Sequence, residues 1–314
     1  MPFSFRSNTI APSQSCHPER SAAESKDLRL LLPTLKNLVQ NGAARLSLGP
    51  HRDRARADAE LLLLHVLGKD KAWLMAHAEE ELSGGQAKRY AEMLERRYRG
   101  EPIQYILGET EFYGLPFRVT PEVLIPRPET EHVVEKVLEF AARFSQPRII
   151  DVGTGSGAIA LALAHHLPCA RITATDIWAH ALDLAHSNAG SNGVSNRIRF
   201  LPGDLFDPVA KEQFEIVVSN PPYVSHNDRD SLAVEVRNHE PALALFAGED
   251  GLEVFRRLIP AAFAALAPGG FVVLEIGYGQ EAAIRALLSV SGFDQIEFTP
   301  DLQGIPRVAS AHRP

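Results

Sequence analysis

The chain has 314 residues, of which 45% are apolar and 23% are charged, a composition typical of a globular protein with one large or two smaller domains and not of a disordered chain. Its two cysteines, Cys16 and Cys169, exclude a disulfide scaffold or a cysteine zinc cluster, and no stretch approaches the roughly 18 apolar residues of a membrane span. The formal net charge of −7 argues against a nucleic-acid partner, which usually requires a basic excess.

Residues 1–27 differ from the rest of the chain, because they are rich in serine and proline and show neither helical nor strand periodicity. They contain no apolar segment of signal-peptide length, and their acidic residues do not fit a transit peptide. We expect a disordered tail, or a start codon assigned too far upstream. The low cysteine content is typical of a reducing compartment, so we expect a cytoplasmic protein.

Residues 28–108 are predicted to form a small helical bundle. Strong helix formers fill residues 55–67 and end at Gly68, and residues 86–99 carry apolar or aromatic side chains at helical spacing. Between residues 51 and 100, 10 basic residues are balanced by 9 acidic ones. This region therefore offers no basic groove for a phosphate backbone.

The pattern changes after residue 108. Strand-forming residues interrupted by Gly114 and Pro116 predict a β-hairpin linker over residues 109–125. In residues 126–314, apolar strands alternate with helices, which predicts an α/β fold with a mainly parallel sheet, closed by an antiparallel pair of strands at the C-terminus. Strands are expected at residues 148–152, 171–176, 198–201, 214–219, 270–276, 295–298 and 307–310, and helices at 129–142, 158–167 and 179–192.

A glycine-rich loop, Asp151-Val-Gly-Thr-Gly-Ser-Gly157, directly follows the first strand of this region and begins a helix. Its spacing is G-x-G-x-G, whereas loops that bind dinucleotide pyrophosphates have G-x-G-x-x-G. The spacing therefore fits a ligand without phosphate, such as S-adenosylmethionine. Asp176 ends the second strand, where a carboxylate can accept hydrogen bonds from both ribose hydroxyls. On this motif alone, nicotinamide binding remains an alternative.

A second motif, Asn220-Pro-Pro-Tyr223, follows the fourth strand at the sheet edge where open α/β folds bind ligands. The two prolines fix the backbone and provide no N–H donors, so their carbonyl oxygens are free to accept. The side-chain oxygen of Asn220 and the carbonyl of Pro221 could accept both N–H bonds of a planar –NH2 group, while Tyr223 packs on its plane. That arrangement would position a nitrogen for methyl transfer.

With these motifs the sequence resembles the class I S-adenosylmethionine-dependent methyltransferases and, more narrowly, the peptide-chain release-factor glutamine methyltransferases of the HemK/PrmC family. The resemblance covers roughly residues 28–314. The Pro-Arg-Pro-Glu-Thr-Glu segment at residues 126–131 and the helical N-terminal region are specific to this family within the wider fold. The other matching segments are residues 100–108, 111–114, 151–157, 219–223, 240–243 and 248–252.

The resemblance implies a Rossmann-like sheet and an enzyme that methylates the side-chain amide of the glutamine in the Gly-Gly-Gln motif of class 1 release factors, thereby modulating translation termination. The implied cofactor is S-adenosylmethionine, and the implied partners include no membrane and no required nucleic acid. By position, the cofactor would contact Gly153, Thr154, Gly155, Ser156, Gly157, Asp176, Asp204, Leu205 and Asn220, and the glutamine would contact Asn220, Pro221, Pro222 and Tyr223. Leu205 often has an aromatic counterpart in the family, so stacking on adenine is expected to be weaker here.

Other candidates have two interpretations each. Arg127 either binds the substrate or forms an ion pair at a domain hinge, and Phe112 either lines the glutamine pocket or packs the hairpin. Asp250 and Glu275 are acidic residues near the active edge of the sheet with no partner evident from sequence. The histidines show no metal-binding spacing, so no metal site is expected.

Three other functions compete with the methyltransferase interpretation. A DNA or RNA adenine-N6 methyltransferase shares the Asn-Pro-Pro-Tyr chemistry but should carry a basic surface. A nicotinamide oxidoreductase is disfavoured by the glycine spacing, and a non-catalytic binding module by the presence of both motifs. The chain itself contains a Gly-Gly-Gln tripeptide at residues 84–86, but it begins a predicted helix, and we interpret it as coincidence and not as a self-methylation site.

Overall fold

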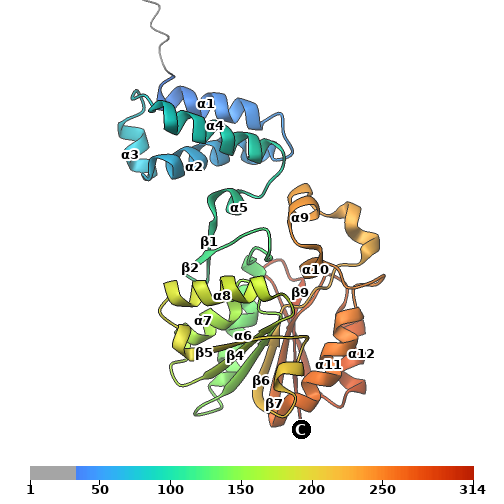
Figure 1. Cartoon of the computed structure of the whole chain (residues 1–314). Coiled ribbons are helices and arrows are strands. Elements are labelled where there is room, and N and C mark those ends of the chain that lie inside the picture. The colour runs from blue at the N-terminus through green and yellow to red at the C-terminus, as the bar shows by residue number, and fades with distance from the viewer. Residues whose placement is uncertain (1–32) are drawn as a thin grey trace, which may run out of the picture.

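The computed structural model describes residues 33–314, so the expectation for residues 1–27 lies outside the described part of the chain. A body of N-terminal helices is joined through a short hairpin to a larger α/β body (Figure 1). The helices of the smaller body are α1 (Leu35–Leu46), α2 (Ala55–Leu67), α3 (Lys71–Ala76), α4 (Gly84–Tyr98) and α5 (Ile103–Leu107).

Local capping explains where these helices begin and end. Gly68 ends α2 with a left-handed φ of +63°, as its glycine predicts. Ser83 and Gln86 form a capping box at the start of α4, in which each side chain accepts from the other residue's backbone N–H. The Gly-Gly-Gln tripeptide therefore starts a helix, as expected, and the side-chain oxygen of its glutamine accepts a hydrogen bond from Ser83 N. Tyr90 lies in the core and donates its hydroxyl to the carbonyl of Ala59 at 3.1 Å.

Two short antiparallel strands, β1 (Glu109–Phe112) and β2 (Leu115–Arg118), form the predicted hairpin. A 3-10 turn, η2 (Pro128–Thr130), then leads into α6 (Glu131–Ala141). Pro126 and Pro128 keep the segment before this turn extended, and α6 begins only after them.

A seven-stranded sheet forms the larger body, with the order β5-β4-β3-β6-β7-β9-β8. Neighbouring strands from β5 to β7 are parallel, and β9 is antiparallel to both β7 and β8, which confirms the predicted sheet and its antiparallel close. The strands are β3 (Arg148–Val152), β4 (Arg171–Asp176), β5 (Ile198–Pro202), β6 (Phe214–Ser219), β7 (Leu266–Glu275), β8 (Asp294–Pro300) and β9 (Pro306–His312).

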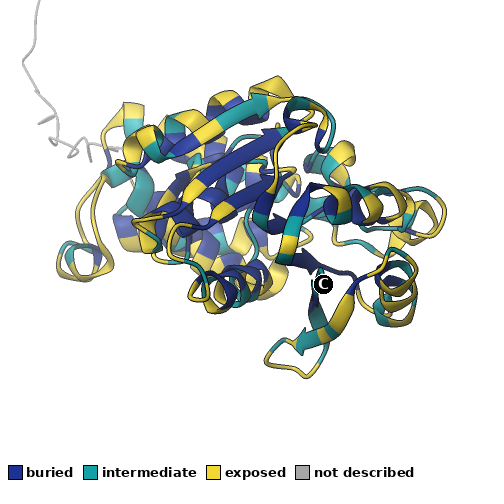
Figure 2. Ribbon diagram, turned by 90° about the horizontal axis from the view of Figure 1, so that it is seen from below, coloured by how far each residue is buried: buried dark blue, intermediate teal, exposed yellow. Residues whose placement is uncertain are grey.

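Each face of the sheet buries its own apolar cluster, because side chains alternate along a strand. Ile149 packs with α6 and α7 (Ala158–His166) on one face, and Ile150 packs with α11 (Glu253–Ala265) and α12 (Glu281–Val290) on the other. Most residues of the central strands β3 and β6 are accordingly buried (Figure 2). Helix α8 (Ala179–Ser191) contacts β4 and β5.

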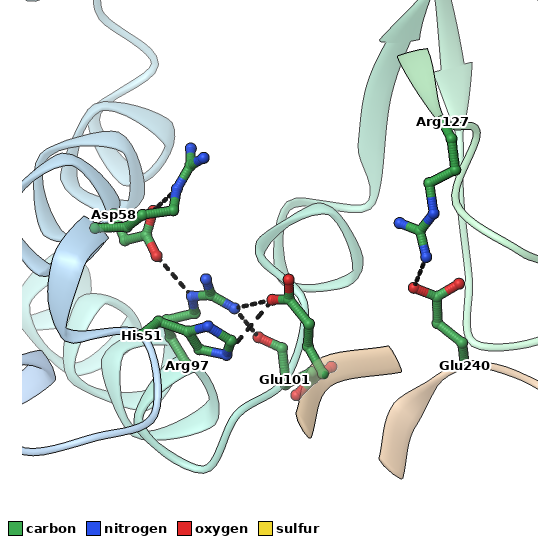
Figure 3. Close-up of polar contacts among 8 residues, drawn as sticks. His51, Asp58, Arg97, Glu101, Arg127 and Glu240 are labelled. Carbon is green, nitrogen blue, oxygen red and sulfur yellow. Dashed lines mark hydrogen bonds and ion pairs between the residues drawn. The ribbon is translucent and has the colours of Figure 1, made fainter. Parts of the chain in front are cut away.

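The segment between β6 and α11 carries α9 (Val234–His239) and α10 (Ala242–Leu245), for which the sequence analysis made no prediction. Helix α9 contacts the helical body through Arg97 of α4, whose side chain is 2% exposed. Arg97 donates to Asp58 of α2 at 2.7 Å and to Glu235 of α9 at 2.9 Å (Figure 3). Arg97 thus joins the buried Asp58 inside the helical body to the partly exposed Glu235 on α9.

Candidate active site

The predicted motifs meet at one edge of the sheet, because the carboxyl ends of parallel strands lie side by side. The glycine-rich loop follows β3, Asp176 ends β4, Asn220 follows β6, and Glu275 ends β7. Strands β4, β3, β6 and β7 are consecutive neighbours in the sheet. Two motifs that are separated by more than sixty residues in the chain are thus brought to adjacent strand ends.

The three glycines of the loop have different roles. All have left-handed φ angles, +75° at Gly153, +56° at Gly155 and +86° at Gly157, which other residues adopt only with strain. A Cβ atom at Gly153 or Gly155 would project into open space, whereas one at Gly157 would lie 2.6 Å from Leu161 Cδ1. Gly157 therefore allows close packing, and the other two line a cradle that a side chain would fill.

The backbone amides of this loop are already used inside the protein. Gly153 N and Thr154 N both donate to the carbonyl of Thr175, at 2.8 and 3.0 Å, and Gly155 N donates to Asp176 Oδ2 at 2.8 Å. The Asp151 carboxylate accepts from Ala160 N in the first turn of α7 at 3.2 Å. Backbone amides that are already paired inside the protein are not available to bind phosphate oxygens. This arrangement argues against a pyrophosphate and fits a phosphate-free ligand.

Asp151 is fully buried beneath the loop. Its Oδ2 also accepts from the Thr154 hydroxyl at 2.6 Å, but its Oδ1 has no hydrogen-bond partner among the described residues. Burial raises the pKa of Asp151 to about 7, a rise that its two hydrogen bonds oppose. Ser156, also buried, accepts through its carbonyl from Asn188 at 2.9 Å, which fixes the end of the loop.

Asp176 is positioned at the rim of the cradle. Its Oδ2 accepts from Gly155 N, and its Oδ1 accepts from Trp178 N at 2.9 Å. Burial raises its pKa, while the backbone hydrogen bonds from Trp178 and Gly155 lower it. A carboxylate oxygen can accept more than one hydrogen bond, so both oxygens retain capacity for ligand hydroxyls.

The loop after β5 carries Asp204 and Leu205. Leu205 has a φ of +48°, unusual for a bulky residue, and its carbonyl accepts from the Thr175 hydroxyl at 3.0 Å. Backbone strain of this kind is typical of ligand-binding loops. The Asp204 carboxylate forms an ion pair with Arg257 of α11.

Asn220 and Tyr223 are connected through buried polar side chains. Asn220 Nδ2 donates to Thr130 Oγ1 at 3.1 Å, and the Thr130 hydroxyl donates to Glu275 Oε2 at 2.6 Å. The Tyr223 hydroxyl donates to the other carboxylate oxygen, Glu275 Oε1, at 3.1 Å. Burial and the neighbouring Glu275 raise the pKa of Tyr223, so its hydroxyl remains protonated.

Two acceptor atoms remain at this motif. Among the described residues, none donates a hydrogen bond to the side-chain oxygen of Asn220 or to the carbonyl oxygen of Pro221. The backbone around them is held in place, because the Ser219 hydroxyl donates to Val152 O at 2.6 Å and Gln280 Nε2 donates to Tyr223 O at 3.0 Å. The motif thus presents free acceptors on a rigid loop.

The surroundings of Phe112 agree with the packing interpretation. Phe112 is 2% exposed, and its ring packs edge-on against Phe117 in the core below the hairpin. Its role as a substrate contact stays a prediction. Arg127 forms an ion pair with the buried Glu240, which follows α9 (Figure 3), and its role as a substrate contact stays a prediction.

Sequence reasoning did not identify Thr130 and Glu275 as partners of the Asn-Pro-Pro-Tyr motif. Thr130 lies within the Pro-Arg-Pro-Glu-Thr-Glu segment, and Glu275 is the last residue of its strand. An acidic residue at the carboxyl end of a central strand is a usable signal, but its partner is 145 residues away in the chain.

A cavity of about 520 Å³ lies at the opposite ends of the strands, lined by Arg148, Arg197 and Arg199 among others. These arginines already pair with Glu215, with two carbonyls and with Glu212, respectively.

Within residues 33–314 no cluster of side chains could hold a metal ion, and no helix is both long and apolar enough to span a bilayer.

Comparison with known proteins agrees with this geometry. Residues 37–108 match the PrmC N-terminal domain, and residues 133–242 match the methyltransferase small domain. The fold is similar to that of the hMettl16 catalytic domain, solved in complex with a 3'UTR hairpin, with a TM-score of 0.54 and 17% identity over 80% of this chain and 90% of that one.

Two relatives share much higher identity. The release factor glutamine methyltransferase of Koribacter versatilis is 42% identical over 82% of this chain and 91% of its own length. The protein of the same name from Bradyrhizobium diazoefficiens is 43% identical over 86% of this chain and 92% of its own length. The cradle, the Asn-Pro-Pro-Tyr loop and this identity over nearly the whole length of both relatives lead to one assignment: the chain belongs to the release factor glutamine methyltransferase family.

Proposed function

We propose that this enzyme transfers a methyl group from S-adenosylmethionine to the side-chain amide nitrogen of the glutamine in the Gly-Gly-Gln motif of class 1 release factors, in the cytoplasm. The observation that carries the proposal is a pair of acceptors, Asn220 Oδ1 and the Pro221 carbonyl, to which no residue of 33–314 donates, on a rigid loop beside the glycine cradle. A primary amide has two N–H bonds, which match two acceptors.

The cofactor would be held by the β3 loop, Gly153 to Gly157, by Asp176, and by Asp204 and Leu205 after β5. Open space at Gly153 and Gly155 and the carboxylate of Asp176 support this assignment. When bound, S-adenosylmethionine supplies an activated methyl group on a sulfonium sulfur.

The chain's own contribution is to hold the substrate nitrogen. By accepting both N–H bonds, Asn220 and Pro221 fix the plane of the substrate amide. The methyl group can then reach the nitrogen only from above or below that plane. Amide nitrogens are poor nucleophiles, and two hydrogen bonds donated to acceptors increase the electron density on the nitrogen. Pro222 keeps the loop rigid, and Tyr223 flanks the plane. The methylated nitrogen then releases its surplus proton to water, which leaves a neutral N-methyl amide.

Residues 28–108 are assigned as the domain that docks the release factor, residues 109–125 as the linker and residues 126–314 as the methyltransferase domain. A glutamine side chain alone offers too little contact area for selectivity, so a wider surface is needed. The balanced charge of the helical region favours a protein partner over a phosphate backbone.

The adenine-N6 methyltransferase alternative is tested by offering both substrates. At low salt, where non-specific DNA binding is strongest, we expect methyl transfer to release factor and none to duplex or single-stranded DNA. Asn220→Ala should lower the transfer rate to release factor roughly 100-fold, the usual effect of removing one oriented polar group from a preorganised site. Transfer to DNA alone, or a native Asn220→Ala protein with a rate within about threefold of wild type, would contradict the proposal.

A further inference from the structure

Both polar side chains of the Asn-Pro-Pro-Tyr motif depend on one buried carboxylate. Glu275 is 2% exposed and Thr130 is 3% exposed, so neither has access to bulk water. Glu275 accepts from the Thr130 hydroxyl with one oxygen and from the Tyr223 hydroxyl with the other. Burial raises the pKa of Glu275, and these two hydrogen bonds oppose that rise by stabilising the ionised carboxylate.

The direction of each hydrogen bond follows from the inventory of donors. An ionised carboxylate, which the two hydroxyl donors favour, can only accept, so Thr130 donates its single hydroxyl proton to Glu275 at 2.6 Å. The Thr130 oxygen then has only lone pairs to offer Asn220, 3.1 Å away. Asn220 must therefore present its NH2 end to Thr130, and its oxygen is left on the opposite side of the amide.

An asparagine amide without this constraint has nearly the same shape in either orientation. In the reversed orientation, Asn220 would present two N–H donors to a substrate amide that is itself a donor. One of the two acceptors needed to hold the substrate –NH2 group would be lost, and a like-dipole contact would replace it.

We propose that Glu275 and Thr130 are positioning residues that hold the Asn220 amide with its oxygen toward the substrate. The buried carboxylate of Glu275 thereby decides that Asn220 presents a hydrogen-bond acceptor, and not a donor, to the substrate. This inference rests on the proposed function. It explains why a threonine at the start of α6 and a glutamate at the end of β7 meet behind the loop after β6.

Thr130→Val removes the hydroxyl and keeps the volume, and Thr130→Ser keeps the hydroxyl. With release factor as substrate, we expect kcat to fall at least tenfold in Thr130→Val and to recover to within about threefold of wild type in Thr130→Ser, with the affinity for S-adenosylmethionine unchanged in both. Glu275→Gln should also lower kcat. The glutamine oxygen can accept from the hydroxyl of Thr130 or of Tyr223, but the NH2 group then faces the other hydroxyl and cannot accept from it.

Non-additivity separates positioning from a general structural role. In an Asn220→Ala background, Thr130→Val should change kcat by less than threefold, because Thr130 acts through the Asn220 amide. A tenfold fall in both backgrounds, equal effects of the valine and serine variants, or kcat within threefold of wild type in both Thr130→Val and Glu275→Gln would overturn the inference.

A second measurement is independent of activity. In protein labelled with ¹⁵N, the side-chain NH2 signal of Asn220 should show a proton slowed in exchange by its bond to Thr130, lost in Thr130→Val and retained in Thr130→Ser. Fast exchange in the wild type would refute the proposed orientation. If the wild type shows this signal but transfers no methyl group to release factor, the proposed function fails while the orientation stands.

Discussion

Alanine substitutions in the glycine loop separate ligand binding from packing. Alanine at Gly155, at Gly157 or at Gly68, a helix end far from the site, must adopt φ of +56°, +86° or +63°. A left-handed φ costs an alanine about 1–2 kcal/mol. A Cβ at Gly155 or Gly68 meets no atom within 4 Å, whereas at Gly157 it would lie 2.6 Å from Leu161 and 3.1 Å from Ala185. Overpacking of this kind adds about 1–3 kcal/mol.

The expected losses in the free energy of unfolding are therefore about 1–2 kcal/mol for Gly155→Ala and Gly68→Ala, and about 2–5 kcal/mol for Gly157→Ala. Urea unfolding measures these values. The variants should rank differently in their affinity for S-adenosylmethionine, because the added Cβ of Gly155→Ala would project into the cradle. We expect calorimetry to show a loss of S-adenosylmethionine affinity of about tenfold or more in Gly155→Ala and none in Gly68→Ala.

Wild-type affinity in Gly155→Ala would refute the assignment of the cradle. Equal stabilities of Gly157→Ala and Gly68→Ala would refute the packing role of Gly157, since the two substitutions share the backbone strain and differ in contacts.

Three further outcomes are expected. Asp176→Ala should weaken S-adenosylmethionine binding by about 1.5–3 kcal/mol, and Asp183→Ala, on the exposed surface, should not; equal affinities by calorimetry would exclude Asp176 as a ligand. Asp151 has a pKa of about 7 when folded against 3.8 ordinarily, so the folded state binds the extra proton between these values, and its contribution to stability falls as the pH rises from about 4 to 7. The stability of wild type relative to Asp151→Asn, from urea unfolding, should accordingly be lower at pH 8 than at pH 5, and a pH-independent difference would contradict the shift. Arg97→Met removes the buried partner of Asp58 and should destabilise the protein by about 3–5 kcal/mol, against less than about 1 kcal/mol for Arg99→Met in an exposed pair; similar losses would show that the buried Arg97–Asp58 pair does not stabilise the helical body.

Local features were predictable because they are encoded locally. Three features each indicate a local requirement. The glycines before α7 indicate left-handed backbone angles, the aspartate that ends β4 indicates a hydrogen-bond acceptor, and the prolines after β6 indicate a rigid loop. Strand alternation then predicts that these segments share one sheet edge, and the sheet order confirms it.

Long-range partnerships were not predictable from one sequence. Glu275 reaches Thr130 because β7 lies beside β6 and α6 packs on the same sheet, a consequence of topology that no local pattern specifies. Phe112 shows the converse limit. The motif allowed either a substrate contact or packing of the hairpin, and its 2% exposure is a tertiary property that the motif does not reveal.

The central claim is that the methyl acceptor is one glutamine of a release factor. It is tested most directly by incubating the enzyme and radiolabelled S-adenosylmethionine with a purified class 1 release factor, and with the same factor carrying glutamate in place of the Gly-Gly-Gln glutamine. The account predicts label on the first protein, located by mass spectrometry to the side-chain amide of that glutamine, and no label on the second. Equal labelling of both proteins, or of neither while duplex DNA is labelled, would contradict it.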